Sequence, residues 1–358
     1  MAHDVLVLGA TVAGLTVARR LARIGYDVVV LDPNAEALSA SIGHGVAAVG
    51  HGSTIANMAH AYGVPAAREH IERNLAGMRE IARNLPDATK LPLRDRSLPG
   101  RDEEESRRIV ALLREAGASA ELIVSPEGPT IISEALCVDP TAYAGALRAA
   151  AVAEGAQIVE SVTVTHLTRR EGSTRVRFLD NRAWVREPKV ISGVAVVDTL
   201  GISPWGRAAR VGPAQWVPFV RGVPAKRRQE VTLESGSTVW MVRPVDDGVL
   251  VLGQKASLSQ IDSAADELRR FVTDEMGLRD PEPGRLAIDP SDHGRPVVGA
   301  SAIPGGFYAR GNGRGELMNG TASGYYLYGL LSGRRDSGNA LPPLTQLKAA
   351  GARLFRRR

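Results

Sequence analysis

The first thirty residues alternate between apolar runs and a helical pattern. Val5–Leu8 and Val28–Leu31 are apolar runs of strand length. Between them, a turn that contains glycine leads into apolar residues at helical spacing, namely Leu15, Ala18, Leu21 and Ala22. This order predicts a strand–helix–strand unit with two parallel strands.

The same kinds of pattern recur along the chain. Helical periodicity predicts helices at Pro65–Leu85, Asp102–Leu113, Tyr143–Glu154, Ile261–Glu275 and Met318–Leu331. Short alternating runs predict strands at Glu121–Val124, Thr130–Ile132, Val159–Leu167, Arg175–Leu179, Val231–Leu233, Val239–Arg243 and Val249–Leu252. Lys189–Asp198 is a continuous apolar run, which is typical of a buried parallel strand. Pro86–Arg101 is rich in Pro and Arg, and we expect a loop there.

The turn of the first unit has the spacing of a dinucleotide-binding fingerprint. Gly9 and Gly14 flank it, but Thr11 stands where a middle glycine is usual. Backbone N–H groups at such a helix start, with the positive end of the helix dipole, suit a pyrophosphate. Asp32 ends the second strand, where a carboxylate would accept a hydrogen bond from a ribose. The alternative is an ordinary strand–helix turn, and the motif alone does not separate FAD from NAD.

Composition and charge exclude several classes of protein. The 358 residues are 44% hydrophobic and carry a net charge of +5, with basic residues scattered and few aromatics, so nucleic-acid binding is not expected. A single cysteine, Cys137, excludes an internal disulfide framework or thiolate metal cluster, and the seven His lack ligand spacing, so no metal is expected. No apolar run approaches the roughly 20 residues of a membrane span. No signal peptide is evident, and we expect a cytoplasmic enzyme.

Five segments in order resemble the D-amino-acid oxidase / glycine oxidase family of FAD-dependent oxidoreductases. They are the fingerprint Val5–Asp32, the Ser- and Gly-rich Ser39–Gly45, the unit Val138–Ala156, the strand–turn and strand entry Val196–Gly222, and the Gly-rich Asp292–Gly315. The resemblance implies FAD rather than NAD as the cofactor. It also implies an α/β fold, in which an FAD-binding Rossmann-like domain of the glutathione-reductase type is interleaved with an antiparallel-sheet substrate domain.

The resemblance divides the chain into discontinuous parts. Residues 1–85, 139–215 and 285–340 are expected to form the FAD-binding domain, residues 86–138 and 216–284 the substrate domain, and residues 341–358 a C-terminal tail. The implied FAD contacts come from several turns. They are Gly9, Thr11, Val12, Ala13, Gly14, Asp32, Pro33, Ser41, Val164, Thr199, Gly201, Gly311, Gly313, Gly315, Glu316, Leu317 and Met318.

The implied reaction oxidises a C–N bond of an amine or amino acid by hydride transfer to flavin N5, with dioxygen as the expected acceptor. The family often holds the substrate carboxylate with an arginine just before the last Gly-rich segment, but residues 286–290 contain none. The candidates for that role are Arg314, which we favour, then Arg243 and Arg285; Trp240 and Asn312 are further candidates for substrate contact. Each has a structural alternative, as a core or surface residue.

His44 follows Ser41 at a spacing seen in related dehydrogenases that bind flavin covalently through histidine. It is therefore a candidate catalytic residue, although a pocket histidine without a covalent link is the commoner case. Two other functions stay open. One is a flavin monooxygenase or dehydrogenase that uses NAD(P)H or another electron partner. The other is a degenerate FAD-binding protein without activity, and the sequence does not determine the oligomeric state.

Overall fold

The predicted strand–helix–strand unit is confirmed in the computed structural model of the chain, in which β1 (His3–Leu8), α1 (Val12–Arg23) and β2 (Val28–Asp32) follow one another. The structure describes residues 2–34, 42–49, 51–98, 100, 102–184, 187–208, 215–234, 238–288 and 295–333. Ser41 and the expected tail therefore lie outside the described residues, as does the side chain of Arg314.

Sheet A surrounds this unit. In its described part, β16, β17, β10, β1, β2 and β7 lie in that order, and β8 and β9 extend it from β10. The bounds of the added strands are β7 Gln157–Glu160, β8 Val162–Arg170, β9 Ser173–Asp180, β10 Pro188–Asp198, β16 Val297–Ala300 and β17 Gly306–Arg310. Because β1 pairs in parallel with both β2 and β10, the carboxyl ends of these strands meet at one edge. That edge is where open α/β sheets bind ligands.

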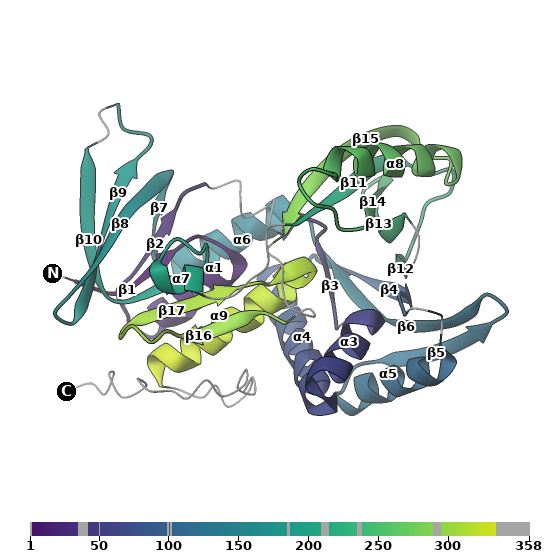
Figure 1. Cartoon of the computed structure of the whole chain (residues 1–358), viewed down its shortest axis with the longest axis horizontal. Helices are drawn as coiled ribbons and strands as arrows, with labels where there is room; N and C mark the ends of the chain where they lie inside the picture. Colours follow the sequence, from purple (N-terminus) through teal and green to yellow (C-terminus); the bar gives the residue numbers. More distant parts are fainter. Residues whose placement is uncertain are drawn as a thin grey trace.

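The prediction that β10 is buried along its length is wrong for its first half. Lys189 pairs antiparallel with Phe178 of β9, and Val190 is 55% exposed. Only the second half lies between β1 and β17 and pairs in parallel with both. The apolar run therefore crosses from an exposed arm, visible beside β8 and β9 in Figure 1, into the core of the sheet.

Sheet B is largely antiparallel and runs in the order β15, β11, β14, β13, β12, β4, β6 and β3, with β5 on β6. Its bounds are β3 Val46–Ala48, β4 Thr89–Arg96, β5 Ala120–Ser125, β6 Gly128–Cys137, β11 Gln215–Val223, β12 Val231–Glu234, β13 Val239–Val245, β14 Gly248–Gly253 and β15 Arg279–Ile288. One face carries an apolar cluster with Met241 and Leu250, and the other packs against α8 through Val242. β3 and the last residues of β15 belong to sheet B, although they fall within residues 1–85 and 285–340, the ranges expected for the FAD-binding domain.

The prediction of a loop at Pro86–Arg101 is wrong, because β4 occupies Thr89–Arg96. Pro92 has no N–H to donate, yet it sits in the middle of this strand. It pairs with Glu134 of β6, whereas pairing with β12 on the other side begins only at Leu93. The proline thus occupies a stretch with a neighbour on one side only, where strand prolines are tolerated.

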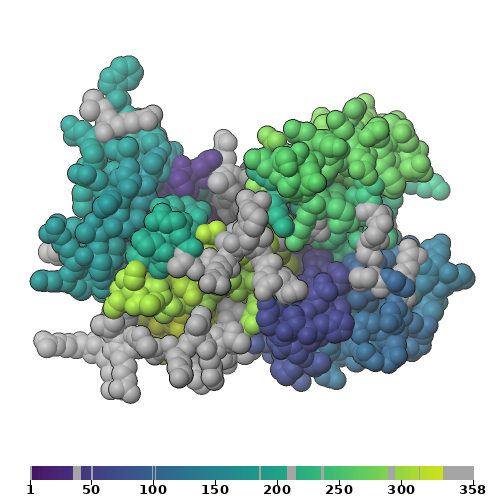
Figure 2. Space-filling model, viewed as in Figure 1, coloured from purple at the N-terminus to yellow at the C-terminus, as the bar shows by residue number. Residues whose placement is uncertain are grey.

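The helices cover the sheets and lie between them (Figure 1). Their bounds are α3 Gly52–Tyr62, α4 Val64–Asn84, α5 Glu103–Glu115, α6 Pro140–Ala153, α7 Pro204–Ala208, α8 Ile261–Asp274 and α9 Glu316–Ser332, with a short 3₁₀ turn, η2, at Gly313–Gly315. Residues of α1 and α9 share one core with Val5 and Val7 of β1, whereas Leu6 and Leu8 pack against Phe178 and Trp205. In Figure 2 the arm of β8–β10 and the α8 region stand at opposite ends of the molecule.

Candidate active site

The turn between β1 and α1 is built around two glycines. Gly9 has φ of 104°, which a residue with a Cβ rarely adopts. A Cβ on Gly14 would lie 2.2 Å from the Gly9 carbonyl oxygen, so only glycine fits this close contact. The backbone N–H groups of Val12 and Ala13 have no hydrogen-bond partner in the described part of the chain. The turn therefore offers free donors at a helix start, which fits a bound pyrophosphate.

Thr11 occupies the off-pattern position without strain. Its backbone is extended, with φ −77° and ψ 172°, and its Oγ1 accepts a hydrogen bond from the Gly14 N–H at 3.1 Å. The side chain thus caps α1, a role for which threonine is well suited. The missing glycine is explained by this extended backbone, because no left-handed conformation is needed here.

We expect the Thr11→Gly variant to bind FAD as tightly as the parent, or more tightly. The substitution removes a side chain beside the expected phosphates, and losing a threonine cap to glycine costs only a few tenths of a kcal/mol. Fluorescence titration of the apoprotein with FAD measures the effect. Affinity weaker by more than about tenfold, or 1.4 kcal/mol, would mean that the hydroxyl itself contacts the cofactor.

Asp32 lies at the end of β2, as expected, and is buried. Its carboxylate accepts a hydrogen bond from the Asn34 N–H at 3.2 Å and forms an ion pair with Arg148 of α6. Arg148 also pairs with Glu160 at 3.1 Å. The fingerprint acid is therefore held in position by a residue that sequence reasoning missed. No local signal could have found Arg148, since it is 116 residues away from Asp32 in the chain.

A second turn, between β10 and α7, meets the first. The Thr199 hydroxyl donates to the carbonyl oxygens of Leu8 at 2.9 Å and Gly9 at 3.2 Å. Gly201 has φ of 74°, and the Arg310 guanidinium fills the space beside it. Val164 and Pro33, the other residues expected near the adenosine part, lie on β8 and directly after β2.

The start of α9 supplies the third group of backbone donors. Gly311 and Gly313 have φ of 69° and 62°, and η2 leads into the helix at Glu316. Asn312 is buried and bonded to α9, because its carbonyl oxygen accepts from Asn319 Nδ2 at 2.8 Å and its Oδ1 accepts from Ser323 Oγ at 3.3 Å. Asn312 therefore holds the turn in place. Buried Leu317 follows Glu316 in the first turn of this helix.

Met318 joins this helix start to sheet B. The Ala48 N–H, in β3, donates to its sulfur at 2.9 Å. The fingerprint turn, the Thr199 turn and the α9 start thus come from distant parts of the chain, and the first two share one edge of sheet A. Free backbone donors, close-fitting glycines and a buried acid at the end of β2 together fit FAD.

Trp240 of β13 is buried between two histidines. Its ring centroid lies 5.7 Å from that of His44 and 5.5 Å from that of His51. His44 Nδ1 accepts a hydrogen bond from the Val46 N–H at 3.1 Å, so this nitrogen is already occupied. His51 was not among the candidate residues named from the sequence, but its contact with Trp240, a candidate substrate residue, makes it part of the same cluster.

Arg243, three residues further along β13, is a buried cation at 5% exposure. One of its terminal nitrogens donates to the carbonyl oxygens of Gly45 at 3.0 Å and Val138 at 3.1 Å. Its Nε has no partner, and no described carboxylate forms an ion pair with it. Burial lowers the pKa of the Arg243 guanidinium, because solvent no longer stabilises the charge.

Arg285 is placed differently from the other candidates. It is more than half exposed, lies 3.6 Å from an oxygen of Asp262 on α8, and stacks over Trp216 at 5.4 Å. Its neighbour Leu286 packs against the apolar cluster that contains Met241, so Arg285 points to the opposite face of sheet B from that cluster. The structure does not bring Arg285 together with Arg243.

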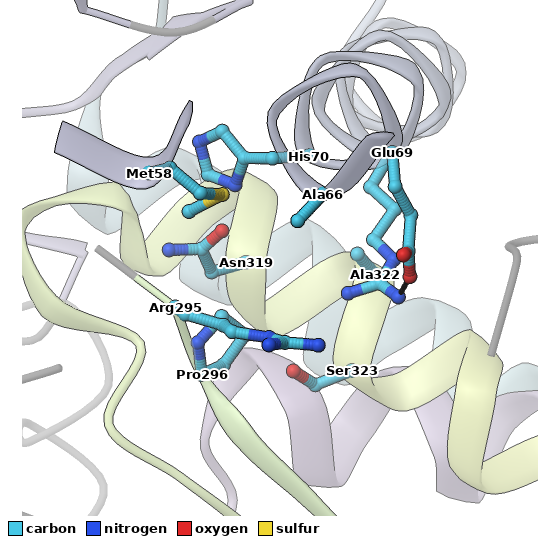
Figure 3. A pocket seen from close by; sticks show the side chains of 10 residues that line it. Met58, Ala66, Glu69, His70, Arg295, Pro296, Asn319, Ala322 and Ser323 are labelled. Carbon is cyan, nitrogen blue, oxygen red and sulfur yellow. Dashed lines mark ion pairs between the residues drawn. The ribbon is translucent and has the colours of Figure 1, made fainter. Parts of the chain in front are cut away.

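A small closed space lies between α4, α9 and the residues before β16. Figure 3 shows Arg295, His70, Asn319 and Glu69 around it. Glu69 forms an ion pair with Arg73 of the same helix. Its volume of about 10 Å³ is the size of one water molecule, so neither a flavin nor an amino acid fits. The substrate site must lie elsewhere.

His70, beside this space, makes the stability depend on pH. Burial, with His51 and Arg295 adding to it, lowers the pKa of His70 to about 4, whereas an unfolded histidine has a pKa of about 6.5. Between these values the unfolded chain binds a proton that the folded protein does not, so stability falls as the pH falls. We expect a loss of about 2 kcal/mol at pH 5 relative to pH 7.5 from this group. Urea unfolding of the parent and His70→Gln at both pH values measures it, and equal losses would contradict the assignment.

Within the described ranges, no group of three or more His, Cys, Asp or Glu is arranged to hold a metal ion. None of the helices described is both long and apolar enough to span a bilayer.

Comparison with solved structures shows the same fold. The glycine oxidase from Geobacillus kaustophilus is 13% identical, covers 94% of this chain and 96% of its own, and has a TM-score of 0.68. The L-proline dehydrogenase from P. horikoshii is 13% identical, the match covers 93% of this chain and 94% of the dehydrogenase, and the TM-score is 0.70. The L-α-glycerophosphate oxidase from Mycoplasma pneumoniae, solved with FAD bound, is 12% identical. The match covers 92% of this chain and 95% of the oxidase, with a TM-score of 0.67. No curated protein matches the sequence.

The family of FAD-dependent oxidoreductases named DAO matches residues 4–330, from the start of β1 to the last turn of α9. This match covers all three turns that fit FAD and both sheets. The chain therefore belongs to the DAO family of FAD-dependent oxidoreductases.

Proposed function

We propose that the protein oxidises the C–N bond of a small amine that carries a carboxylate, an amino acid, with dioxygen as the electron acceptor. In this proposal sheet A and its helices hold FAD, and the Met241–Leu250 face of sheet B provides the substrate site. The single observation that carries the substrate class is Arg243, a buried guanidinium that forms no ion pair with any described residue.

The argument rests on the cost of burying a charge. A cation removed from water is unfavourable unless it is paired, and Arg243 contacts two carbonyl oxygens and the Cys137 thiol, keeps an Nε without a partner, and forms no ion pair with a described carboxylate. A substrate carboxylate would supply the missing anion and could bond the guanidinium through two parallel hydrogen bonds. The Gly45 carbonyl that binds Arg243 belongs to the segment expected over the flavin, which favours a location near the reacting atoms.

The names of the similar structures support an anionic substrate. Glycine and proline, after which two of them are named, each carry a carboxylate, and glycerophosphate carries a phosphate. The common feature is a small anion. The buried cation on sheet B would recognise this feature in any of the three.

The three Gly-rich turns would hold FAD, and the bound cofactor would supply the hydride-accepting atom, N5, for the oxidation of the substrate carbon. The task of the chain is then to bind and orient the substrate. Arg243 would fix the carboxylate end, and Trp240 would wall the side chain. The first-turn N–H groups of α9, at Glu316, Leu317 and Met318, would stabilise negative charge on the cofactor ring.

Arg314 and His44 keep their predicted roles as proposals. Arg314 lies in η2, next to the α9 start, and is a second candidate for the carboxylate. His44 lies beside Trp240. A covalent bond from His44 to the flavin would have to use Nε2, because Nδ1 already accepts the Val46 N–H. Acid precipitation tests that bond, since only covalently bound flavin stays in the pellet.

The test is anaerobic mixing of the FAD-loaded protein with paired substrates, an amino acid and the amine that lacks its carboxylate. We expect the amino acid to bleach the flavin and the amine to bleach it at least about tenfold more slowly, as expected for a lost charged hydrogen bond. Arg243→Gln should remove the difference. Recovery of colour with peroxide release on adding air supports dioxygen; recovery only with an artificial acceptor indicates a dehydrogenase. No bleaching by any amine or amino acid would overturn the proposal.

A further inference from the structure

Arg243 opens into a groove in sheet B that carries an excess of positive charge. The groove has a volume of about 580 Å³, and its lining includes four arginines, Arg221, Arg227, Arg228 and Arg243. None of these four guanidinium groups forms an ion pair with a residue in the described ranges. The lining holds two carboxylates, of Asp139 and Asp246, so the four cations outnumber them.

The register of sheet B fixes how two of these arginines lie. Leu250 of β14 stands directly opposite Arg221 of β11 on one side and Arg243 of β13 on the other. Residues directly opposite each other in neighbouring strands point to the same face, so the two arginines flank Leu250 on the groove side. Their Cα atoms are two strand spacings apart, which is about 10 Å.

The nearby acids form no ion pair with either arginine, although the charges of Asp139 and Asp246 favour the charged form of Arg243. Asp139 accepts a hydrogen bond from the Ala142 N–H at 2.7 Å and so caps α6. Asp246 lies in the turn between β13 and β14. Glu282 of β15 stands opposite Arg221 in the sheet but makes no ion pair with it. Both arginines are therefore available to an anion from solution.

We propose that the substrate carries two carboxylates, one held by Arg243 and the second by Arg221. This rests on the proposed function, because it extends the same site. The two guanidinium groups are carried by strands two spacings apart and line the same groove, so the two carboxylates of one substrate can each bond a separate arginine. Arg227 and Arg228, on the segment between β11 and β12, attract such a dianion toward the groove. The preferred substrate class is thus an aminodicarboxylate or an N-carboxyalkyl amino acid.

The test uses redox-inert probes, so that it does not depend on catalysis. Calorimetric titration of the FAD-loaded protein compares glutarate, with two carboxylates, and butyrate, with one. We expect glutarate to bind at least tenfold more tightly, as a second charged hydrogen-bonded contact provides. Arg221→Gln should lower the affinity for glutarate to that for butyrate and leave butyrate unchanged. The matched control is Arg270→Gln, on the exposed surface of α8, which should change neither.

Two results overturn the inference: equal affinity for glutarate and butyrate, or an Arg221→Gln variant that keeps the preference. Failure of glutarate to bind does so too. Flavin bleaching separates this outcome from failure of the proposed function. If amines bleach the flavin but glutarate neither binds nor inhibits, the function stands and the second contact is wrong. If glutarate binds through Arg221 but no amine bleaches the flavin, the dianion site stands and the amine oxidation is wrong.

Discussion

Replacing Gly14 by alanine is expected to abolish FAD binding under ordinary conditions. The new Cβ would lie 2.2 Å from the Gly9 carbonyl oxygen, a backbone atom that cannot turn aside as a side-chain end can. The turn must open, which displaces the free N–H groups of Val12 and Ala13 from the pyrophosphate. We expect the dissociation constant to rise at least about 100-fold, equivalent to nearly 3 kcal/mol. Fluorescence titration of the apoprotein measures this loss.

The matched control is Gly145→Ala, in the middle of α6. A Cβ at this position meets nothing within 4 Å, so alanine fits without any movement. Helix propensity should make this variant more stable by up to about 1 kcal/mol, with FAD affinity unchanged. If Gly14→Ala also binds FAD like the parent, the turn is more compliant than its geometry indicates and the phosphate assignment is wrong.

The second large effect is expected at Asp198, at the end of β10. Its carboxylate is fully buried and accepts hydrogen bonds from the backbone N–H groups of Leu200 at 2.9 Å and Gly201 at 2.8 Å. It also accepts from the N–H of Ser203 at 2.6 Å and from its hydroxyl at 2.5 Å. Asp198→Ala leaves these donors without an acceptor, and we expect the free energy of unfolding to fall by about 3 kcal/mol or more. Urea unfolding of the apoprotein is the measurement.

The Asp198→Asn variant separates the effect of losing hydrogen-bond acceptors from the effect of losing the side chain's volume. The amide keeps one acceptor oxygen, so it should recover part of the loss. Asp274→Ala, in the exposed last turn of α8, is the surface control and should be close to neutral. An Asp198→Ala variant that unfolds like the parent would show that water replaces the carboxylate at this turn.

Local patterns predicted many of the helices and strands well. The helices α4, α5, α6, α8 and α9 and the meander β12–β14 fall within a few residues of the predicted ranges. In α4, α5 and α8 the apolar spacing marks one buried face, whereas α9 is buried on nearly all sides. β4 was missed because proline and arginine normally mark loops. Its stability as a strand comes from β6, whose partner residues lie about forty positions later in the chain.

The candidate site was predictable only in part, for a similar reason. Fingerprint glycines and Asp32 are local signals, so their place at the edge of sheet A could be predicted. The partner of Asp32, Arg148, and the alignment of Arg221 with Arg243 across Leu250 depend on pairings between distant segments. The unpaired charge of Arg243 is likewise a property of burial. No spacing in the sequence distinguishes it from an arginine on a solvated edge.

The contact of Thr199 with Leu8 has a consequence for how the protein is made. These residues are 191 positions apart, yet their hydrogen bond joins the two turns that meet at the expected pyrophosphate position. When β1, α1 and β2 have left the ribosome, the fingerprint turn therefore still lacks the Thr199 turn that contacts it. The helix α9 is synthesised later still. Parallel pairing over such separations is slow and leaves apolar edges exposed meanwhile. FAD can then bind only late in folding. We expect the supply of flavin during expression to govern the fraction of protein molecules that fold rather than aggregate.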